Sequence, residues 1–504
     1  GRALSTLEQQ LAVYREAAEA GSSDEAADRL DAARNELLAT EAEWSAFRRE
    51  LSRRHPVTVG DGFGLDEVQS TLDEDSAIIG WLDTDPATDA SESWGYVIRQ
   101  SGPVAWAKLG HSDVSRAFRQ GVRDRASAEA GVARDGRGLW LECLAPLSAA
   151  LEDIENLIVI PSGAMLGVPV EALVDEGGIR LVDKYVISYA PSASVQTWLH
   201  AGGSYAPHDR TRRMLLVGDP PFDGTQIADA GPSGHKPLVE AAGAMGALEP
   251  SVIRSALVGN EEALSALPRL WGTRQEVGAI AALVEEAELL VGVEATEQAI
   301  VHLEESGDLA EFPVIHFATH AFADDESPER SALILSRVGL PDPLGAAVAG
   351  ERVHDGLVSA LDVLREWDLD ADLVTLSACE TGLGREVRGE GHVGLAHAFL
   401  QAGARSLLVS LWKVDDRATA LLMRRFYENY LGCGDRGHMG RSEALREAKR
   451  WLRAYTSERG GRSADSLGSG DLEDLAGGGP DLVVVLRPRQ ERCRVTRPPQ
   501  NKAY

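Results

Sequence analysis

Residues 373–382 read Leu-Val-Thr-Leu-Ser-Ala-Cys-Glu-Thr-Gly, and residues 314–321 read Val-Ile-His-Phe-Ala-Thr-His-Ala. Each stretch is an apolar run of strand length that passes directly into a polar loop. Further runs of this kind, separated by stretches with helical spacing, lie at 214–219, 289–291, 332–335 and 406–412. Continuous apolar strands that alternate with helices are typical of a mostly parallel sheet covered on both faces. We therefore predict an α/β fold with a mostly parallel central sheet flanked by helices.

Capping signals and apolar spacing predict the helices between these strands. Thr273 and Glu276 have the spacing of a capping box, which predicts a helix that begins there and runs to about residue 286. Further helices are predicted near 138–152, from about 391 to 402 and from 417 to 430. The apolar run from Leu482 to Leu486 is predicted to be a last strand.

The chain divides into four segments by composition and spacing. Residues 1–55 carry an apolar stripe at helical spacing and predict an N-terminal helical hairpin. This hairpin is either the last unit of a helical repeat or a plain amphipathic hairpin that packs on the next domain. Residues 56–205 are mixed α/β, and residues 206–458 carry the alternation of strands and helices. Residues 459–504 are rich in Gly, Ser and Asp and end in a basic tail, so we expect a flexible linker and tail.

Charge and composition exclude several classes of protein. The 504 residues include 79 acidic and 50 basic ones, which give a net charge of −29 and argue against a nucleic-acid binder. No run approaches the roughly 18 apolar residues that a membrane span needs, and no signal peptide is visible. The four cysteines form no CxxC pair, which fits a reducing compartment. We therefore expect a cytoplasmic protein that binds neither nucleic acid nor membrane directly.

No motif in the sequence predicts a cofactor or a metal. The glycines between 382 and 394 are spaced like a phosphate-binding loop, but no Gly-Lys-Ser/Thr sequence follows them. His392 and His397 would need further ligands to hold a metal ion, and the sequence offers none nearby. We interpret the glycine-rich segment as an activation loop or as a loop of the substrate cleft, and we expect neither a cofactor nor a metal.

His320 and Cys379 stand out as a catalytic pair. Both follow predicted strands closely, so both are expected at the same edge of a parallel sheet. His320 precedes Cys379 by 59 residues, and caspase-type enzymes carry their histidine roughly 50 residues before an Ala-Cys step. A thiolate attacks a peptide carbonyl far better than a thiol does, and a histidine can shuttle the proton near neutral pH. The backbone N–H groups of Cys379 and Ala321 are the expected donors to the oxyanion.

The remaining histidine and cysteine candidates have plainer interpretations. His316 lies in the middle of its strand and is predicted to be a buried residue that supports the site from behind. Cys143 lies in an apolar helical stretch and is predicted to pack in the core. Cys433 lies in a glycine-rich loop and is predicted to be inert, whereas Cys493 in the basic tail is predicted to be exposed.

The two motifs together resemble a known family. The long block at 373–416, with Ser-Ala-Cys-Glu-Thr-Gly and Ser-Leu-Leu-Val-Ser-Leu-Trp-Lys-Val-Asp-Asp, is similar to the CHAT peptidases. These are caspase- and separase-like cysteine proteases that often sit beside tetratricopeptide repeats. The block from His316 to Ala321 matches the histidine motif of the family, and the similarity extends over roughly residues 56–455.

The resemblance implies a caspase-like sandwich fold in which residues 206–458 are the catalytic domain. It makes residues 56–205 the N-terminal α/β part of the CHAT region, or a pseudo-protease half. It also implies that Cys379 is the nucleophile and His320 the base. The sequence departs from the family in two places: Ala321 stands where such sites usually carry Gly, and the usual closing His-Pro-Tyr-Tyr-Trp-like segment is not found.

A pocket for a basic substrate side chain would need a carboxylate at its base. Four acidic residues near the predicted strand ends are candidates for this role, namely Asp324, Glu380, Asp415 and Asp416. We favour Asp415 as the acid of the S1 pocket, which predicts cleavage after Arg or Lys. Asp415 could equally cap the helix that begins near residue 417.

The leading hypothesis is therefore a cysteine endopeptidase that cuts a specific protein substrate, with a basic residue at P1. The resemblance implies regulated proteolysis in bacterial defence or cell death, gated by a partner or a ligand. We expect the helical hairpin to be the element on which a regulatory partner docks. One alternative is a caspase-like scaffold or interaction module with weak or absent proteolysis. Another is a different thiol enzyme, such as an acyl transferase, that uses the same dyad.

Overall fold

The computed structural model describes most of the residues between 63 and 460. The described residues are 63–83, 92–110, 118, 129–201, 213–227, 264, 267–324, 327–340, 346, 352–378, 385–387, 391–410, 416–433, 437–460 and 482–485. The predicted helical hairpin at 1–55 and nearly all of the predicted linker and tail at 459–504 lie outside the described residues.

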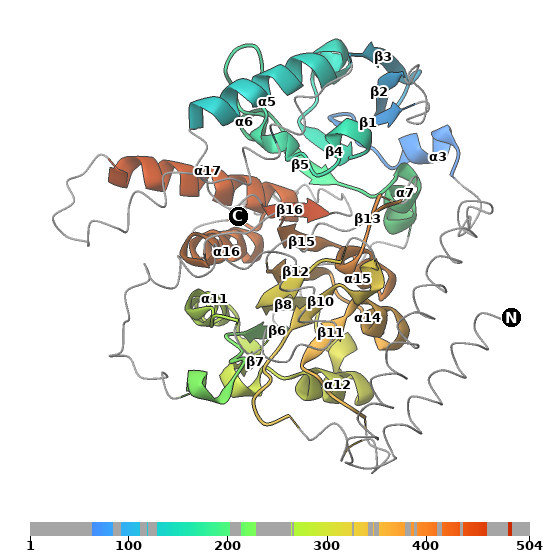
Figure 1. Cartoon of the computed structure of the whole chain (residues 1–504). Helices are drawn as coiled ribbons and strands as arrows, with labels where there is room; N and C mark the ends of the chain where they lie inside the picture. The colour runs from blue at the N-terminus through green and yellow to red at the C-terminus, as the bar shows by residue number, and fades with distance from the viewer. Residues whose placement is uncertain are drawn as a thin grey trace, which may run out of the picture.

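One large sheet runs through the described part of the chain (Figure 1). Its strands, in order across the sheet, are β3 (Ala105–Leu109), β2 (Ser93–Arg99), β1 (Ser76–Asp83), β4 (Asn156–Ile160), β5 (Val186–Tyr189), β16 (Leu482–Val485), β15 (Leu407–Ser410), β12 (Leu373–Ser377), β8 (Val314–Ala318), β6 (Arg213–Gly218) and β7 (Glu286–Val291). We call β1 to β5 the N-terminal half of the sheet. We call β6, β7, β8, β12 and β15 the C-terminal half.

Most neighbouring strands are parallel. Strands β1, β4 and β5 are parallel in the N-terminal half, and the five strands of the C-terminal half are parallel to one another. Strands β2 and β3 extend one edge in antiparallel orientation. Strand β16 pairs antiparallel with β15 and parallel with β5, so it joins the two halves. The prediction of a mostly parallel sheet is confirmed. The strand predicted at 482–486 is β16, which lies between the two halves.

Helices cover both faces of the C-terminal half (Figure 1). One face carries α11 (Trp271–Ala281), α16 (Asp416–Leu431) and α17 (Arg441–Gly460), and the other carries α12 (Glu297–Glu305), α14 (Ala360–Glu366) and α15 (Leu395–Gln401). In β8, Ile315 and Phe317 face the α12 side, whereas Val314 and Ala318 face the α11 side. Burial on both faces explains why the strand is an unbroken apolar run. The predicted α/β fold with flanking helices is confirmed.

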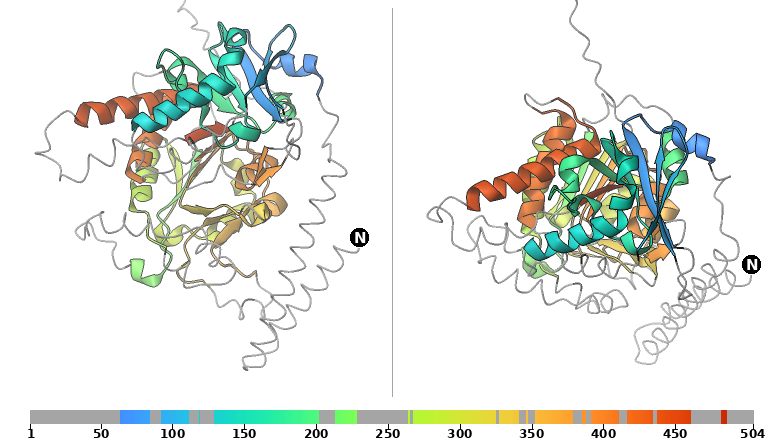
Figure 2. Two further views of the ribbon diagram at one scale, coloured as in Figure 1. Left: turned by 45° about the horizontal axis from the view of Figure 1, so that its top comes forward. Right: turned by 90° about the horizontal axis from the view of Figure 1, so that it is seen from above.

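The N-terminal half is covered in the same way (Figure 2). One face packs on α5 (Glu129–Cys143) and on the 3-10 helix Ala145–Leu151, and the other packs on α3 (Leu65–Ser70) and α7 (Ala193–Ala201). The short helix α6 is Leu181–Lys184, and short 3-10 helices lie at Gly163–Met165, Val170–Ala172, Gly224–Ile227, Gly292–Glu294, Asp308–Glu311 and Pro328–Arg330.

Helix α17 ties the two halves together through basic side chains. Arg446 donates from Nε to the carbonyl of Val182 and from Nη2 to that of Asp183, each at 2.8 Å. Lys449 Nζ lies 2.7 Å from Oε1 of Glu171, and both side chains are nearly buried. These bonds fix α17, which packs in the C-terminal half, against the N-terminal half.

Two small sheets lie beside the large one. Strands β9 (His320–Phe322), β10 (Ala332–Ile334) and β11 (Leu357–Ser359) form an antiparallel sheet in which β10 is central. Strands β13 (Arg385–Val387) and β14 (Gly391–Val393) form a hairpin. Strand β9 begins only two residues after β8 ends, so the chain enters the small sheet directly from the edge of the large one.

Two predicted helix starts are wrong. The capping box predicted at Thr273 does not form, because α11 begins at Trp271 with Leu270 as its N-cap, and Thr273 is buried in the first turn. The helix predicted from residue 391 begins at Leu395, because residues 391–393 pair in the β13–β14 hairpin. The predictions of strand β12 and of helix α16 are confirmed within one residue.

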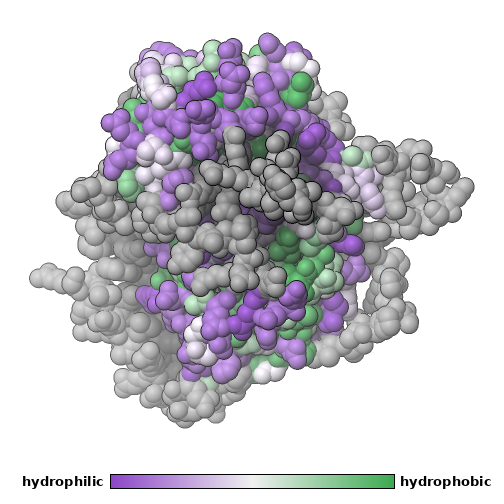
Figure 3. Space-filling model, turned by 180° about the vertical axis from the view of Figure 1, so that it is seen from behind, coloured by the Kyte–Doolittle hydropathy of each residue, from purple (hydrophilic) through white to green (hydrophobic). Residues whose placement is uncertain are grey.

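The surface agrees with the polar composition of the chain. Seen from behind, hydrophilic residues dominate the upper part of the molecule, and a hydrophobic patch is visible in the lower part (Figure 3). Leu289 in the edge strand β7 and Val293 just after it are among the exposed large apolar residues. Within the described ranges, no helix is long and apolar enough to cross a bilayer.

Candidate active site

The topology of the C-terminal half predicts where a site should lie. Strand β8 lies between β6 and β12, although β7 separates β6 from β8 in the sequence. The strand order therefore reverses between β6 and β8, and crevices in parallel sheets form at the carboxyl ends of the strands at such a point. Asp219 follows β6 at this edge, and His320 lies two residues beyond the end of β8.

The register aligns the two strand ends that precede the predicted catalytic residues in the sequence. Strands β8 and β12 are parallel neighbours, and Ala318 at the end of β8 pairs with Ser377 at the end of β12. His320 follows the first of these residues by two positions, and Cys379 follows the second by two positions. Cys379 itself lies outside the described residues.

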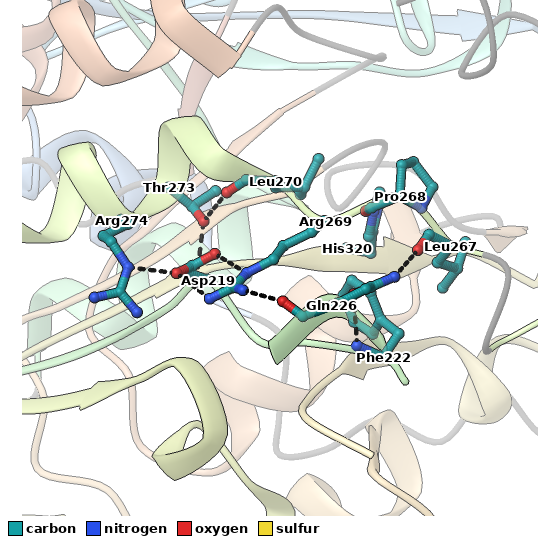
Figure 4. A network of polar contacts seen from close by, with 10 residues as sticks. All are labelled: Asp219, Phe222, Gln226, Leu267, Pro268, Arg269, Leu270, Thr273, Arg274 and His320. Atoms are coloured by element: carbon teal, nitrogen blue, oxygen red, sulfur yellow. Dashed lines mark hydrogen bonds and ion pairs between the residues drawn. The ribbon is translucent and has the colours of Figure 1, made fainter. Parts of the chain in front are cut away.

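His320 is half-buried and held on two sides. Its Nε2 lies 2.8 Å from the carbonyl oxygen of Pro268, and its ring packs against Phe222 with 5.3 Å between the ring centroids (Figure 4). A carbonyl oxygen can only accept, so Nε2 carries the hydrogen, and the neutral ring has its lone pair on Nδ1. This tautomer has the basic nitrogen that a proton acceptor needs.

Asp219 forms the centre of a second cluster at the same edge. Its carboxylate is fully buried and accepts a fork of two bonds from Arg269, 2.6 Å from Nε to Oδ1 and 2.8 Å from Nη2 to Oδ2. Arg274 adds a bond of 2.5 Å from Nε to Oδ2. The backbone N–H of Asp219 donates to Oγ1 of Thr273 over 3.0 Å. Four donor and acceptor contacts thus fix this residue (Figure 4).

Gln226 connects this cluster to the segment that holds His320. Its side-chain Nε2 donates to the backbone carbonyl of Leu267 over 2.8 Å. Its backbone carbonyl accepts from Nη1 of Arg269 over 2.6 Å. Its Oε1 accepts from the backbone N–H of Phe222 over 2.9 Å. Leu267 and Arg269, the two neighbours of Pro268 in the chain, are therefore both hydrogen-bonded to Gln226.

His316 lies in a buried polar chain on the α11 side of the sheet. Its Nε2 is 3.0 Å from Oε1 of Glu276, its Nδ1 is 3.2 Å from the hydroxyl of Tyr427, and that hydroxyl is 2.8 Å from Oγ1 of Thr375. Burial raises the pKa of Tyr427, so the phenol keeps its proton within this chain. His316 is fully buried, as predicted, and the chain joins α11, α16 and two strands of the sheet.

The other predicted site residues lie in different settings. Ala321, a predicted oxyanion donor, pairs with Leu333 in the small sheet. Asp324, a predicted S1 acid, accepts from the backbone N–H of Ser327 at 2.9 Å in a local turn. Glu380 and Asp415 lie outside the described residues, and Asp416 is the first residue of α16, where only the backbone is described.

Two other thiols are described. Cys143 is buried in the N-terminal half, and burial together with Glu142 and Asp83 raises the pKa of its thiol to about 12. Cys433 is half-buried at the end of α16, and burial also raises its pKa. Both thiols are therefore protonated near neutral pH and poor nucleophiles. Within the described ranges, no cluster of three metal-ligating side chains occurs.

Sequence reasoning missed Asp219, Arg269 and the carbonyl of Pro268. Asp219 is only the last residue of the strand predicted at 214–219, and no motif marks it. Arg269 lies 50 residues further along the chain, and no spacing rule links the two positions. The carbonyl of Pro268 belongs to the backbone, so its role leaves no mark in the sequence.

Comparison with known proteins identifies relatives of this chain. The family model of the CHAT domain matches residues 133–476. Tetratricopeptide repeat protein 28 of Mus musculus is 30% identical over 211 residues, and so is its counterpart of Homo sapiens. The match covers 36% of this chain but only 8% of each relative, so the chain corresponds to a small part of their length.

Solved structures give more distant similarities. The separase–securin complex of Saccharomyces cerevisiae is similar with a TM-score of 0.34 at 10% identity, over 96% of this chain and 27% of that chain. The Arg specific cysteine proteinase gingipain R is similar with a TM-score of 0.36 at 10% identity, over 74% of this chain and 73% of that chain.

Proposed function

The chain belongs to the CHAT domain family, a family of caspase-like cysteine proteases, and on this basis we propose that it is a cysteine endopeptidase with Cys379 as nucleophile and His320 as base. The single observation that carries the proposal is the register of β8 and β12. It pairs Ala318 with Ser377, so the chain leaves the sheet at one edge two residues before each proposed catalytic residue.

The hydrogen bond between His320 and Pro268 supports the role of base. With the hydrogen on Nε2, the lone pair of Nδ1 accepts the proton of the Cys379 thiol. The thiolate attacks the peptide carbonyl carbon, and the oxyanion is stabilised by the backbone N–H groups of Cys379 and Ala321. His320 then gives its proton to the leaving amine, and a thioester remains.

Hydrolysis completes the cycle. Water loses a proton to Nδ1 of His320 and attacks the thioester carbon. The C–S bond breaks, the carboxylic acid product leaves, and the proton on His320 returns to the sulfur. Every proton that leaves a reactant thus passes through one imidazole, whose orientation depends on the carbonyl of Pro268.

We extend the proposal to the substrate and the setting. Asp415 is the proposed acid of the S1 pocket, with Asp416, Asp324 and Glu380 as neighbouring candidates, so the cut would follow Arg or Lys. We propose a protein substrate, a cytoplasmic location, a regulatory partner that docks on residues 1–55 and a role in bacterial defence. These finer assignments rest on the sequence motifs.

Substitution of the two catalytic residues tests the proposal. We expect Cys379→Ala and His320→Ala each to lower cleavage of a diverse peptide library by about 10³-fold or more. Cys433→Ser is the matched control, because it removes a half-buried thiol outside the site and should leave cleavage unchanged. Unchanged cleavage in Cys379→Ala would refute the protease assignment. A preference for acidic or apolar residues at P1 would remove Asp415 from the pocket.

A further inference from the structure

The backbone conformation of Asp219 is uncommon for a residue other than glycine. It follows directly after β6 with a φ of 56°, and among the described non-glycine residues only Asp153 also has a positive φ. Residues other than glycine seldom adopt such angles, although aspartate does so more readily than most, and these positions gather at functional sites. Asp219 is at the carboxyl edge beside His320, whereas Asp153 lies in a turn of the N-terminal half.

The contacts of Asp219 explain how this conformation is enforced. The fork from Arg269 uses both carboxylate oxygens, and a planar guanidinium that binds in this way fixes distance and direction together. The side chain of Arg269 is only 6% exposed, so water competes little for either partner. The contact therefore holds the backbone at residue 269 in one place relative to the end of β6.

Residue 269 is the immediate neighbour of the carbonyl that binds His320. Pro268 precedes Arg269 in the chain, and its oxygen lies 2.8 Å from Nε2 of His320. Gln226 adds a second tether to the same segment through Leu267. The path from the carboxylate of Asp219 to the imidazole of His320 thus runs through one ion pair, one peptide unit and one hydrogen bond (Figure 4).

We propose that Asp219 is a positioning residue for His320: through its fork with Arg269 it sets the place of the Pro268 carbonyl, and this carbonyl sets the tautomer and direction of the imidazole. The inference rests on the proposed function of His320 as a base. Among the described residues, the polar contacts of Asp219 are with Thr273, Arg269 and Arg274, so it acts on His320 indirectly. Because a displacement of about 1 Å at a catalytic group can cost about 100-fold in rate, a shift of this carbonyl should reduce catalysis without removing either catalytic residue.

A purely structural role is the competing explanation, and the chain contains a matched control for it. Asp372, just before β12 at the opposite edge of the same sheet, is buried and bound by Arg405, with 2.9 Å between Oδ1 and Nη1. Asp372→Asn therefore weakens a comparable ion pair far from the proposed site. It should affect stability in the same way as Asp219→Asn but should not affect His320.

The experiment measures the reactivity of Cys379 with iodoacetamide, which needs no knowledge of the natural substrate. The full chain is alkylated between about pH 5.5 and pH 9, and the adduct on the Cys379 peptide is followed by mass spectrometry. A thiol paired with a positioned histidine stays reactive well below its ordinary pKa of about 8.5. The wild type should therefore react fast near pH 6.5, and His320→Ala should lose this reactivity.

For Asp219→Asn we expect the rate near pH 6.5 to fall by about tenfold toward that of His320→Ala, with rates near pH 9 within about twofold of the wild type. Arg269→Lys keeps the charge but loses the fork, so its alkylation rate near pH 6.5 should fall by about threefold. Asp372→Asn should keep the profile of the wild type. Melting curves confirm that each variant is folded, and Arg269→Lys carries the test if Asp219→Asn does not fold.

The possible results separate the two proposals. A wild-type profile equal to that of His320→Ala would overturn the proposed function and this inference together. A wild type that is reactive near pH 6.5 and loses this in His320→Ala, but keeps it in Asp219→Asn and Arg269→Lys, would overturn only the positioning role. An equal loss in Asp372→Asn and Asp219→Asn would also overturn it, since the effect would then be general destabilisation.

Discussion

The two halves of the sheet share one architecture but differ at their carboxyl edges. In the N-terminal half, β1 and β4 are parallel neighbours in register, as β8 and β12 are in the C-terminal half. The loop after β4 is fixed by Ser162, whose hydroxyl donates to the carbonyl of Trp81. The edge after β6 and β8 instead carries a buried carboxylate, two arginines and a histidine. The two halves thus share the geometry of their sheets, and they differ in the polar residues that lie just beyond the strands.

One buried carboxylate in each half shows a second difference between the halves. Glu171 in the N-terminal half accepts from the hydroxyl of Tyr189 and pairs with Lys449 of α17, so it ties the halves together. Glu276 in the C-terminal half pairs with His316, and its chain continues to Tyr427 within that half. The first contact links the two halves, whereas the second fixes β8, the strand that ends two residues before His320.

The largest expected difference between the halves is in thiol reactivity. Cys143 has a pKa raised to about 12, so at about pH 7.5 its thiolate fraction is far below that of an ordinary cysteine. We expect iodoacetamide to modify Cys379 at least about 10³-fold faster than Cys143 in the native protein. Mass spectrometry of the two peptides over time measures the ratio.

Unfolding provides the control for this prediction. In about 8 M urea burial is lost, and the two cysteines should react at rates within a few fold of each other. Equal rates in the native protein would mean that the N-terminal half holds a reactive thiol, or that Cys379 is not activated. The two halves would then not differ in the reactivity of their thiols.

Two glycines, one in each half, test how tightly the turns of the two halves are packed. Gly403, in the turn before β15, has a φ of 115°, and a β-carbon there would lie 1.9 Å from the backbone oxygen of Leu369. Gly102, in the hairpin of β2 and β3, has a φ of 89° with nothing within 4 Å of such a carbon. We expect Gly403→Ala to lower the free energy of unfolding by about 3 kcal/mol or more, and Gly102→Ala by about 1–2 kcal/mol. Urea titrations measure both values.

Gly278 in α11 is the control for these substitutions. A β-carbon at this position would have no neighbour within 4 Å, and the residue lies inside a helix, so Gly278→Ala should stabilise the protein by about 0.5–1 kcal/mol. If Gly102→Ala costs as much as Gly403→Ala, then the backbone angle and not the close contact sets the cost. The C-terminal half would then be no more tightly packed around its turns than the N-terminal half.

Much of the fold could be predicted because the sheet leaves a strong pattern. Strands buried on both faces, such as β8 and β12, are unbroken apolar runs, and their carboxyl ends are marked by the first polar residues. The family motifs around His320 lie at such an end. The start of α11 was placed wrongly, because Thr273 and Glu276 have the spacing of a cap but are used in tertiary contacts with Asp219 and His316.

The support of His320 could not be predicted from sequence for a different reason. It depends on an aspartate and an arginine that are 50 residues apart and on a backbone carbonyl. Local patterns contain no information on such a pair, since it forms only when the end of β6 and the segment before α11 meet. The positive φ of Asp219 is likewise a property of the folded chain.

The smallest expected effect concerns the contact between α16 and α17, where the C-terminal half meets the helix that binds the N-terminal half. Burial raises the pKa of Glu447, but hydrogen bonds from Arg425 and Asn429 outweigh it, and the net pKa lies below the usual 4.5. A lowered pKa means that the stabilisation is present above about pH 4.5 and is lost as the pH falls through the folded-state value. Because the side chain is partly exposed, we expect Glu447→Gln to lower the free energy of unfolding by less than about 1 kcal/mol at pH 7, and this difference from the wild type should vanish near pH 3.

Urea titrations at several pH values measure this difference, with Glu305→Gln on the exposed side of α12 as the control. A difference that stays constant or grows on acidification would show that the carboxylate does not stabilise this contact through its charge.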